Sequence, residues 1–439
     1  MVNPFALFSK KIFADYLLKK IVKNSGIVFI GNTGASILSF ISFAVMAKQL
    51  GPSSLSILVL AQTYSMVVND VFNIQTWESL IKFVPVHDEK IQTINVIKSN
   101  LLLDGISAFV AATFAVILAI PVTKILHWDY GNINYLLAYS MSIVFNITTL
   151  TIGIPRLFNK FEFVAKSQIV FAGVKLIAVL IMAYQNKPFN YYFIAYLAAE
   201  MFTNITIVIY SLLLISNEYN KWWQGKVKFD KNQLQFIWWT NLRTIVRIPV
   251  RRLDVMIINL TMPLEMVGVF KVYKEIAGIL DRLSDPINQA IFPEFTKLIG
   301  VNQVAQAKEV AKKIFTLLFW VSLALAVIML FLSKFIVSVF FGLQYMSHIP
   351  ALLLFICFNW FVFFTTPINS LFIAAGFAKF SFYLVLFTNA IFLFVAYSLG
   401  MVIGIYGIIA AFVIQGVVNQ GLKVYLMKKH SIGWNAVIR

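Results

Sequence analysis

The residues of this sequence best suited to chemistry are basic side chains that interrupt two otherwise apolar segments, 236–262 and 264–285. Arginine presents a planar fork of N–H donors that matches phosphate and carboxylate oxygens, and lysine adds a mobile point charge. The pattern therefore predicts an anion site, and its candidate ligands are Arg243, Arg247, Arg251, Lys271, Lys274 and Arg282.

These side chains share faces if both segments are helices. At about 100° per residue, the three arginines fall within an arc of about 80° that also contains Asp254. The second segment gathers its charges within an arc of about 120°. That arc holds Lys271, Lys274, Glu275, Asp281, Arg282 and Asp285.

The cost of burying charge decides what this stripe must face. Three arginines facing lipid would cost segment 236–262 about 8–10 kcal/mol on the insertion scale. Arg247 and Arg251 lie about 16 and 22 Å from the segment's start, which is too deep for easy snorkelling. We therefore expect the stripe to line a water-filled cavity. The alternative is internal pairing of Arg251 with Asp254 and of Lys271 with Glu275, which would leave an excess of positive charge.

Other polar residues interrupt the apolar segments of the first half as well. Most are expected to form ordinary hydrogen bonds between helices. A minority role, in the cavity or in coupling to a cation, is assigned to Asn32, Asp70, Asp104, Glu200, Asp254 and Glu275.

Enzymatic chemistry has no support in the residues. The four histidines, His87, His127, His348 and His430, are scattered without metal-ligand spacing, and no glycine-rich phosphate loop appears. The single cysteine, Cys357, excludes an intrachain disulfide. The sequence thus predicts a protein that is not an enzyme and that needs no cofactor or metal.

Composition requires a membrane protein. Hydrophobic residues make up 60% of the chain and charged ones 12%, with a mean hydropathy of +0.83, well outside the range of soluble domains. We expect an all-α polytopic membrane protein of about twelve helices. The predicted spans are 27–47, 54–74, 99–122, 133–153, 168–185, 190–216, 236–262, 264–285, 314–332, 349–374, 380–400 and 402–424.

The basic residues outside the spans predict the orientation. Alternate connections and both ends of the chain carry 24 of them and the opposite connections carry 4, a split that the positive-inside rule assigns to cytoplasmic termini. The net charge of +18 is therefore an orientation signal facing anionic lipid, not a nucleic-acid site. The predicted parts are a basic arm (1–26), two six-helix bundles (27–218 and 236–426), a linker (219–235) and a basic tail (427–439). The bundles resemble each other in span spacing and in the prolines Pro52 and Pro263, as in transporters built from repeats.

An ordered set of motifs carries a resemblance to a known family. It comprises "KNSGIVFIGNTGASILSFISFAVMAKQLGP" from Lys23, "WESLIKFVP" from Trp77, "RLFNKF" from Arg156, the long stretch "RRLDVMIINLTMPLEMVGVFKVYKEIAGILDRLSDPINQAIFPEFTKL" from Arg251, and "VFFGLQY" from Val339. Together they resemble Wzx-type polysaccharide (O-antigen) flippases, whose MOP superfamily also holds the MATE exporters and lipid II flippases. The stretch Ser53-Ser54-Leu55-Ser56 departs from the usual glycine-rich pattern.

The resemblance implies a V-shaped, MATE-like arrangement of two six-helix bundles in the bacterial inner membrane, with alternating access. The implied substrate is a polyprenyl-diphosphate-linked oligosaccharide for O-antigen-like or capsule-like polysaccharide. Membrane lipids and polymerase machinery are the implied partners. Two alternatives stay open, a MATE-type cation-coupled exporter and a membrane scaffold for glycan assembly that transports nothing. A lipid II flippase would be expected to carry two more helices.

Overall fold

The computed structural model of the chain describes residues 4–84, 90–126, 128, 130–282 and 284–429. The side chains of 4–30, 32, 130, 281, 282, 285, 286, 289 and 290 lie outside the described part. Every regular element within the described ranges is a helix. The chain divides into two compact units, one of 1–49, 68–120 and 136–241 and the other of 50–67, 121–135 and 242–439.

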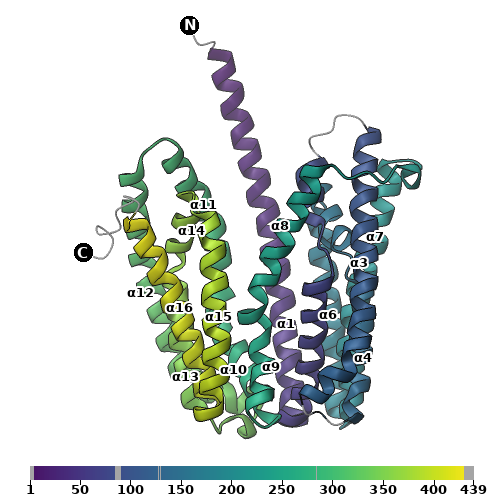
Figure 1. Cartoon of the computed structure of the whole chain (residues 1–439), viewed down its shortest axis with the longest axis vertical. Coiled ribbons are helices and arrows are strands. Elements are labelled where there is room, and N and C mark those ends of the chain that lie inside the picture. The colour runs from purple at the N-terminus through teal and green to yellow at the C-terminus, as the bar shows by residue number, and fades with distance from the viewer. Residues whose placement is uncertain (1–3, 85–89, 127, 129, 283, 430–439) are drawn as a thin grey trace. The chain divides into compact units, whose positions relative to one another are not determined.

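Unit 1 is built around a hydrophobic core to which α2, α3, α5 and α7 contribute, with Leu80 and Ile154 fully buried. Its helices are α1 (Pro4–Phe72) outside 50–67, α2 (Trp77–Phe83), α3 (Lys90–Ile125) as far as residue 120, α4 (Ile133–Ser142), η3 (Ile143–Phe145), η4 (Thr149–Gly153), α5 (Ile154–Leu157), α6 (Phe161–Tyr184), α7 (Phe189–Glu218), η5 (Trp222–Gln224) and most of α8 (Lys231–Ile248) (Figure 1).

Unit 2 holds the remaining helices and the charged segments of the sequence. In it α15 and α16 pack along each other and are joined at Gly404, whose φ of 63° suits glycine. Besides the parts of α1, α3 and α8 that it includes, its elements are η2 (Tyr130–Asn132), η6 (Pro249–Leu253), α9 (Asp254–Thr261), α10 (Glu265–Arg282), α11 (Ser284–Gly300), α12 (Val304–Ile336), η7 (Val337–Phe341), η8 (Leu343–Tyr345), α13 (Ile349–Phe364), α14 (Thr366–Ala374), α15 (Ala378–Ile403) and α16 (Ile405–Lys429).

The described helices make the chain a polytopic membrane protein. Eight are long and apolar enough to cross a bilayer, or nine if Ile133–Phe145 and Thr149–Leu157, bent by 55°, form one span. The predicted span 27–47 and all but the last two residues of 54–74 fall within α1, where Gly51, at φ 79° and ψ 173°, separates two helices. The predicted spans 236–262 and 264–285 are helical but are not among the eight, because their basic and acidic residues lower their hydropathy.

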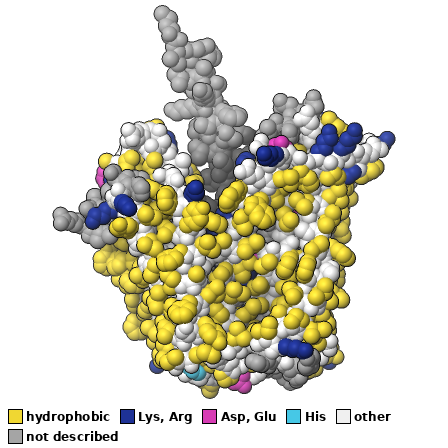
Figure 2. Space-filling model, in the orientation of Figure 1, with side chains coloured by type: hydrophobic (Ala, Val, Ile, Leu, Met, Phe, Trp, Pro, Cys, Tyr) yellow, Lys and Arg dark blue, Asp and Glu magenta, His cyan; other side chains and the backbone are white. Residues whose placement is uncertain are grey.

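Figure 2 shows apolar side chains along the sides of the helices, with lysine and arginine gathered toward the helix ends. Large apolar side chains are among the most exposed, including Phe331 at 84% and Phe394 at 75%. Such exposure would be a liability in water but is expected where helices meet lipid.

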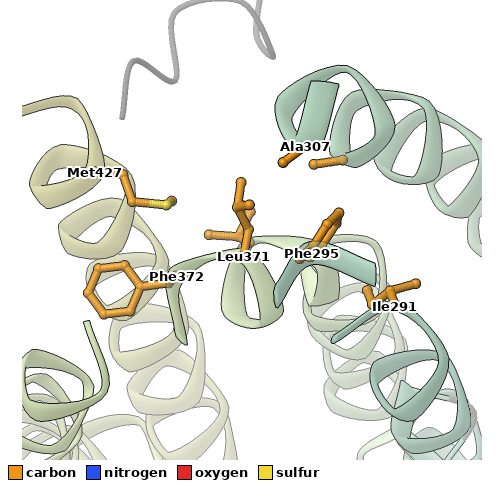
Figure 3. Close-up of a cluster of buried hydrophobic side chains, with 8 residues drawn as sticks. Ile291, Phe295, Ala307, Leu371, Phe372 and Met427 are labelled. Atoms are coloured by element: carbon orange, nitrogen blue, oxygen red, sulfur yellow. The ribbon is translucent and has the colours of Figure 1, made fainter. Parts of the chain in front are cut away.

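One cluster of buried apolar side chains holds α11, α12, α14 and α16 together (Figure 3). Phe295 of α11, Phe372 of α14 and Met427 of α16 are fully buried in it. The sequence did not predict α11 as a separate helix, because its polar and charged positions match a connection between spans. Its packing against α14 instead fixes it to the bundle.

The two proline-containing segments that resemble each other in sequence meet inside unit 2. Ser53 Oγ donates to Glu265 Oε1 at 3.0 Å, and the backbone N–H of Gly268 donates to Ser56 Oγ at 2.8 Å. A Cβ at Gly268 would overlap the carbonyl oxygen of Pro52, whereas a Cβ at Gly278 on the same helix would meet nothing within 4 Å. Gly268 therefore permits the close approach of α10 to the segment that begins at Pro52.

We expect Gly268→Ala to lower stability by about 1–3 kcal/mol, because the added methyl overpacks against backbone that cannot yield. The measurement is the thermal unfolding midpoint of the purified protein in detergent. Gly278→Ala is the matched control, and its midpoint should stay the same or rise, since alanine favours helix over glycine. Equal midpoints for the two variants would contradict the packing argument.

Candidate functional site

The candidate site lies on a long helix that changes form partway along. α8, the π-helix η6 and α9 run without a break from Lys231 to Thr261, a length of about 45 Å. Arg247 lies about 24 Å from its start and about 21 Å from its end. Arg243, Arg247 and Arg251 are all exposed. A charge at this depth is tolerated only where water or a partner reaches it.

The acid beside this stripe is paired with lysine from the next helix. Asp254 is fully buried, and Lys274 Nζ of α10 lies 2.5 Å from its Oδ2. Lys274 also donates to the backbone carbonyl of Arg251 at 3.2 Å and lies 6.0 Å from the centre of the Phe412 ring. The predicted alternative pairing of Arg251 with Asp254 is therefore wrong. The π-helix between them is the reason, because its wider turn shifts the faces that regular helical spacing assigns.

The second pair of that alternative is present. Lys271 Nζ lies 2.8 Å from Glu275 Oε1, one turn apart on α10, and both side chains are partly exposed. Lys271 and Lys274 thus each have an acidic partner. Besides carrying charge, they stabilise α10 through these ion pairs. The three arginines are the more exposed basic residues of the two charged segments.

A further basic residue belongs with the stripe and was not predicted. The predicted orientation counts Lys423 among the 24 basic residues on the side of the termini, but α16 continues to Lys429 and Lys423 is only 4% exposed. Its Nζ donates to Asn369 Oδ1 at 2.9 Å. The usable signal is the polar spacing of Gln415, Asn419 and Lys423, four residues apart on one helix face.

Amide side chains continue this polar surface between α15 and α16. Asn389 donates to the carbonyl of Val246 at 2.5 Å, next to Arg247 in the chain. Gln415 and Asn419 both donate to Thr388 Oγ1 at 3.4 Å. Unit 2 therefore places amides, a buried lysine and an exposed arginine in one neighbourhood.

The remaining predicted residues lie elsewhere or outside the described side chains. Asp70 and Glu200 are half-buried and Asp104 is fully buried, all in unit 1. The side chains of the predicted residues Asn32 and Arg282, and those of the basic arm and of 430–439, fall outside the described residues. Within the described part, no three His, Cys, Asp or Glu residues gather where a metal ion would fit.

Comparison with known proteins fixes the family. Residues 21–299 match the family described as polysaccharide biosynthesis protein. The chain belongs to this family. The match covers more than half of the sequence and includes the arginine stripe, α9 and α10.

This member of the polysaccharide biosynthesis family also resembles other known proteins at low identity. The inner membrane protein YghQ of Escherichia coli (strain K12) is 24% identical over 162 residues, which are 36% of this chain and 46% of that protein, so the match spans about half of its length. Two solved structures align over 94% of this chain. The lipid II flippase MurJ, in an inward closed conformation, has a TM-score of 0.71 at 15% identity over 90% of its length. A MATE family multidrug resistance transporter of the MOP superfamily, in an inward-facing conformation, has 0.70 at 14% identity over 99% of its length. The predicted resemblance and the predicted fold class are thereby confirmed.

We expect Lys274→Met to destabilise the protein by about 3 kcal/mol, because it leaves the Asp254 carboxylate buried without its partner. The double variant Asp254→Asn with Lys274→Met should recover much of that loss. Thermal unfolding in detergent measures both. Lys271→Met is the control, since a partly exposed pair contributes about 0–1 kcal/mol. A Lys274→Met effect no larger than that of the control would show that the Asp254 pair does not brace these helices.

Proposed function

We propose that this protein is a flippase that moves polyprenyl-diphosphate-linked oligosaccharide repeat units across the bacterial cytoplasmic membrane by alternating access. The observation that carries the proposal is the exposed arginine stripe, Arg243, Arg247 and Arg251, in the middle of a membrane-length helix. Membership of the polysaccharide biosynthesis family supports the class of substrate.

The chemistry of a diphosphate headgroup matches these side chains. Each guanidinium offers paired N–H donors to phosphate oxygens, and its charge persists at any physiological pH. The carboxylates of Asp254 and Glu275 pair with Lys274 and Lys271. In this proposal the exposed arginines bind the mobile anion, and Lys423, buried on α16 against Asn369, adds a further basic group.

The amide groups nearby suit the sugar part of such a substrate. Asn389, Gln415 and Asn419 carry both donors and acceptors, which sugar hydroxyls require. In this proposal the polyprenyl chain stays in the bilayer against the exposed apolar faces, and the protein carries out no covalent chemistry. Polymerase machinery would receive the translocated repeat.

The rival functions make less use of this surface. A MATE-type exporter of organic cations would carry substrates that a cationic stripe repels. A scaffold that transports nothing would gain nothing from three arginines at mid-membrane depth, which are costly to insert. Resistance to cationic dyes on overexpression is the observation that would favour the exporter.

We expect Arg247→Ala to reduce export of surface glycan at least tenfold, because a charge-assisted hydrogen bond contributes about 1.5–3 kcal/mol. The host lacking the gene should lose surface glycan and accumulate the lipid-linked repeat, and wild type should restore both. Both quantities are measured in complemented strains with matched protein levels in the membrane.

Two further variants control this experiment. Arg247→Lys keeps the charge but not the fork and should be intermediate. Lys313→Ala removes an exposed pair with Glu309 and should export normally. Normal export by both Arg247→Ala and Arg251→Ala would rule out the stripe as the headgroup site.

The proposed orientation, with both termini in the cytoplasm, is tested by single-cysteine labelling. Cys357 is exposed and is first replaced by serine. The cysteine of Lys226→Cys, in a basic connection, should react with an impermeant maleimide only after the cells are permeabilised. Cysteine at Gln185, in a connection of the opposite set, should react in intact cells. The reverse pattern would overturn the orientation.

A further inference from the structure

Unit 1 contains a buried carboxylate that the arginine stripe does not explain. Asp104 is fully buried in α3, about 21 Å along the helix from Lys90. Its Oδ2 accepts hydrogen bonds from Thr148 Oγ1 at 2.9 Å and from the backbone N–H of Thr149 at 2.5 Å. Its Oδ1 has no hydrogen-bond partner among the described residues. One oxygen is thus fully engaged and the other is bare.

None of the ion pairs in the described part compensates this carboxylate. It is fully buried, and its described hydrogen bonds come from the uncharged groups of Thr148 and Thr149. In the described part of unit 1, the elements around it carry several charged groups, and none of the ion pairs there involves Asp104. These groups are Lys48 and Asp70 on α1, Glu78 and Lys82 on α2, Lys90 and Lys98 on α3, Arg156 on α5, and Glu200 and Glu218 on α7. An isolated buried carboxylate is costly unless a cation or a proton neutralises it.

A second bare oxygen lies on the same face of the helix. Asn100 is also fully buried, four residues before Asp104, and its Oδ1 has no partner among the described residues. Its amide nitrogen donates to the carbonyl of Val96 at 2.8 Å, which fixes the oxygen as the free end. The two acceptor oxygens, on Asn100 and Asp104, are one helical turn apart, and neither has a donor among the described residues. A positively charged group held between them would satisfy both.

Oxygen atoms surround these two acceptors. They come from two places where the helical structure is interrupted. Thr76, which follows the break after α1, contacts Thr149 Oγ1 at 2.6 Å and donates to the carbonyl of Asn100 at 3.1 Å. Thr149 opens the π-helix η4, where the two helices bend by 55°. Hydroxyl, amide, carbonyl and carboxylate oxygens are ligands for hard cations.

The geometry points to a binding site for a small monovalent cation, a proton or Na⁺, between Asp104 Oδ1 and Asn100 Oδ1. A single carboxylate matches one positive charge. Clusters of acidic residues of the kind that bind divalent cations are absent from the described part of unit 1. Neutralising Asp104 weakens its charge-assisted bonds to Thr148 and Thr149, so occupancy of the site acts on the bend between α4 and η4. This inference does not depend on the identity of the transported substrate.

The test is the thermal unfolding midpoint of the purified full-length protein in detergent, measured against Na⁺ with choline as the balancing ion and against pH. A ligand that binds only the folded state raises the midpoint. Wild type should gain stability with Na⁺ at pH 8 if the cation is sodium. It should gain stability only with falling pH, whatever the Na⁺ concentration, if the cation is a proton.

Asp104→Asn is the decisive variant, because its amide oxygen still accepts from Thr148 and Thr149 and its NH₂ replaces the cation beside Asn100. In this variant the unfolding midpoint should no longer depend on Na⁺ or pH as it does in wild type, and it should stay high under all these conditions. Glu162→Gln, which changes an exposed carboxylate of unit 1 that pairs with Lys166, is the control and should retain the dependence. If Asp104→Asn does not accumulate, Asn100→Leu takes its place, because it leaves the hydrogen bonds to the Asp104 carboxylate intact. It should shift the Na⁺ concentration at half-saturation or the pH at the midpoint of the response. A wild-type response that is unchanged in Asp104→Asn, or in Asn100→Leu when that variant is used, would overturn the inference.

Discussion

Hydrocarbon offers a charged side chain neither water nor counterions, so every charge carried into a membrane-spanning helix must be satisfied by the protein or by a cavity. This protein uses three solutions. Asp254 is paired with Lys274 from a neighbouring helix. Lys423 is bound by the neutral amide of Asn369, and Arg247 is exposed. The first solution ties two helices together, the second gives a buried lysine a neutral partner, and the third keeps a basic side chain exposed.

The same constraint explains why the irregular backbone lies beside polar side chains. A π-helix interrupts the regular hydrogen-bond pattern, and a membrane tolerates such a backbone only where protein covers it or water reaches it. The π-helix Pro249–Leu253 directly precedes Asp254, and its carbonyl at Arg251 accepts from Lys274. The π-helix Thr149–Gly153 begins with an N–H that donates to Asp104. In both units a charged side chain therefore satisfies the backbone where the helix departs from regularity.

The sequence predicts the helices well because hydrophobicity and length carry most of that information. It also identifies the stripe Arg243, Arg247 and Arg251, since regular spacing within α8 keeps Arg243 and Arg247 on one face. It misassigns the partner of Asp254 because a π-turn, which no periodicity of 3.6 contains, lies between Arg251 and that acid. Lys423 is missed for a different reason. Its place near the end of an apolar segment resembles an orientation signal, and only the full length of α16 shows that it is buried.

Assigning Lys423 to a membrane-spanning helix affects the candidate site more than it affects the predicted orientation. The split of basic residues between alternate connections becomes 23 to 4, which still favours cytoplasmic termini. At the site, however, Lys423 extends the polar surface that Asn389, Gln415 and Asn419 form on α15 and α16. In the proposed function, an anion bound there would be attracted by basic groups from both α8 and α16. A transporter benefits from such an arrangement only if the loaded site is not too stable to release its substrate. Placing Arg247 on an exposed face while burying Lys423 against Asn369 meets both requirements, because water competes for the arginine and the amide already holds the lysine.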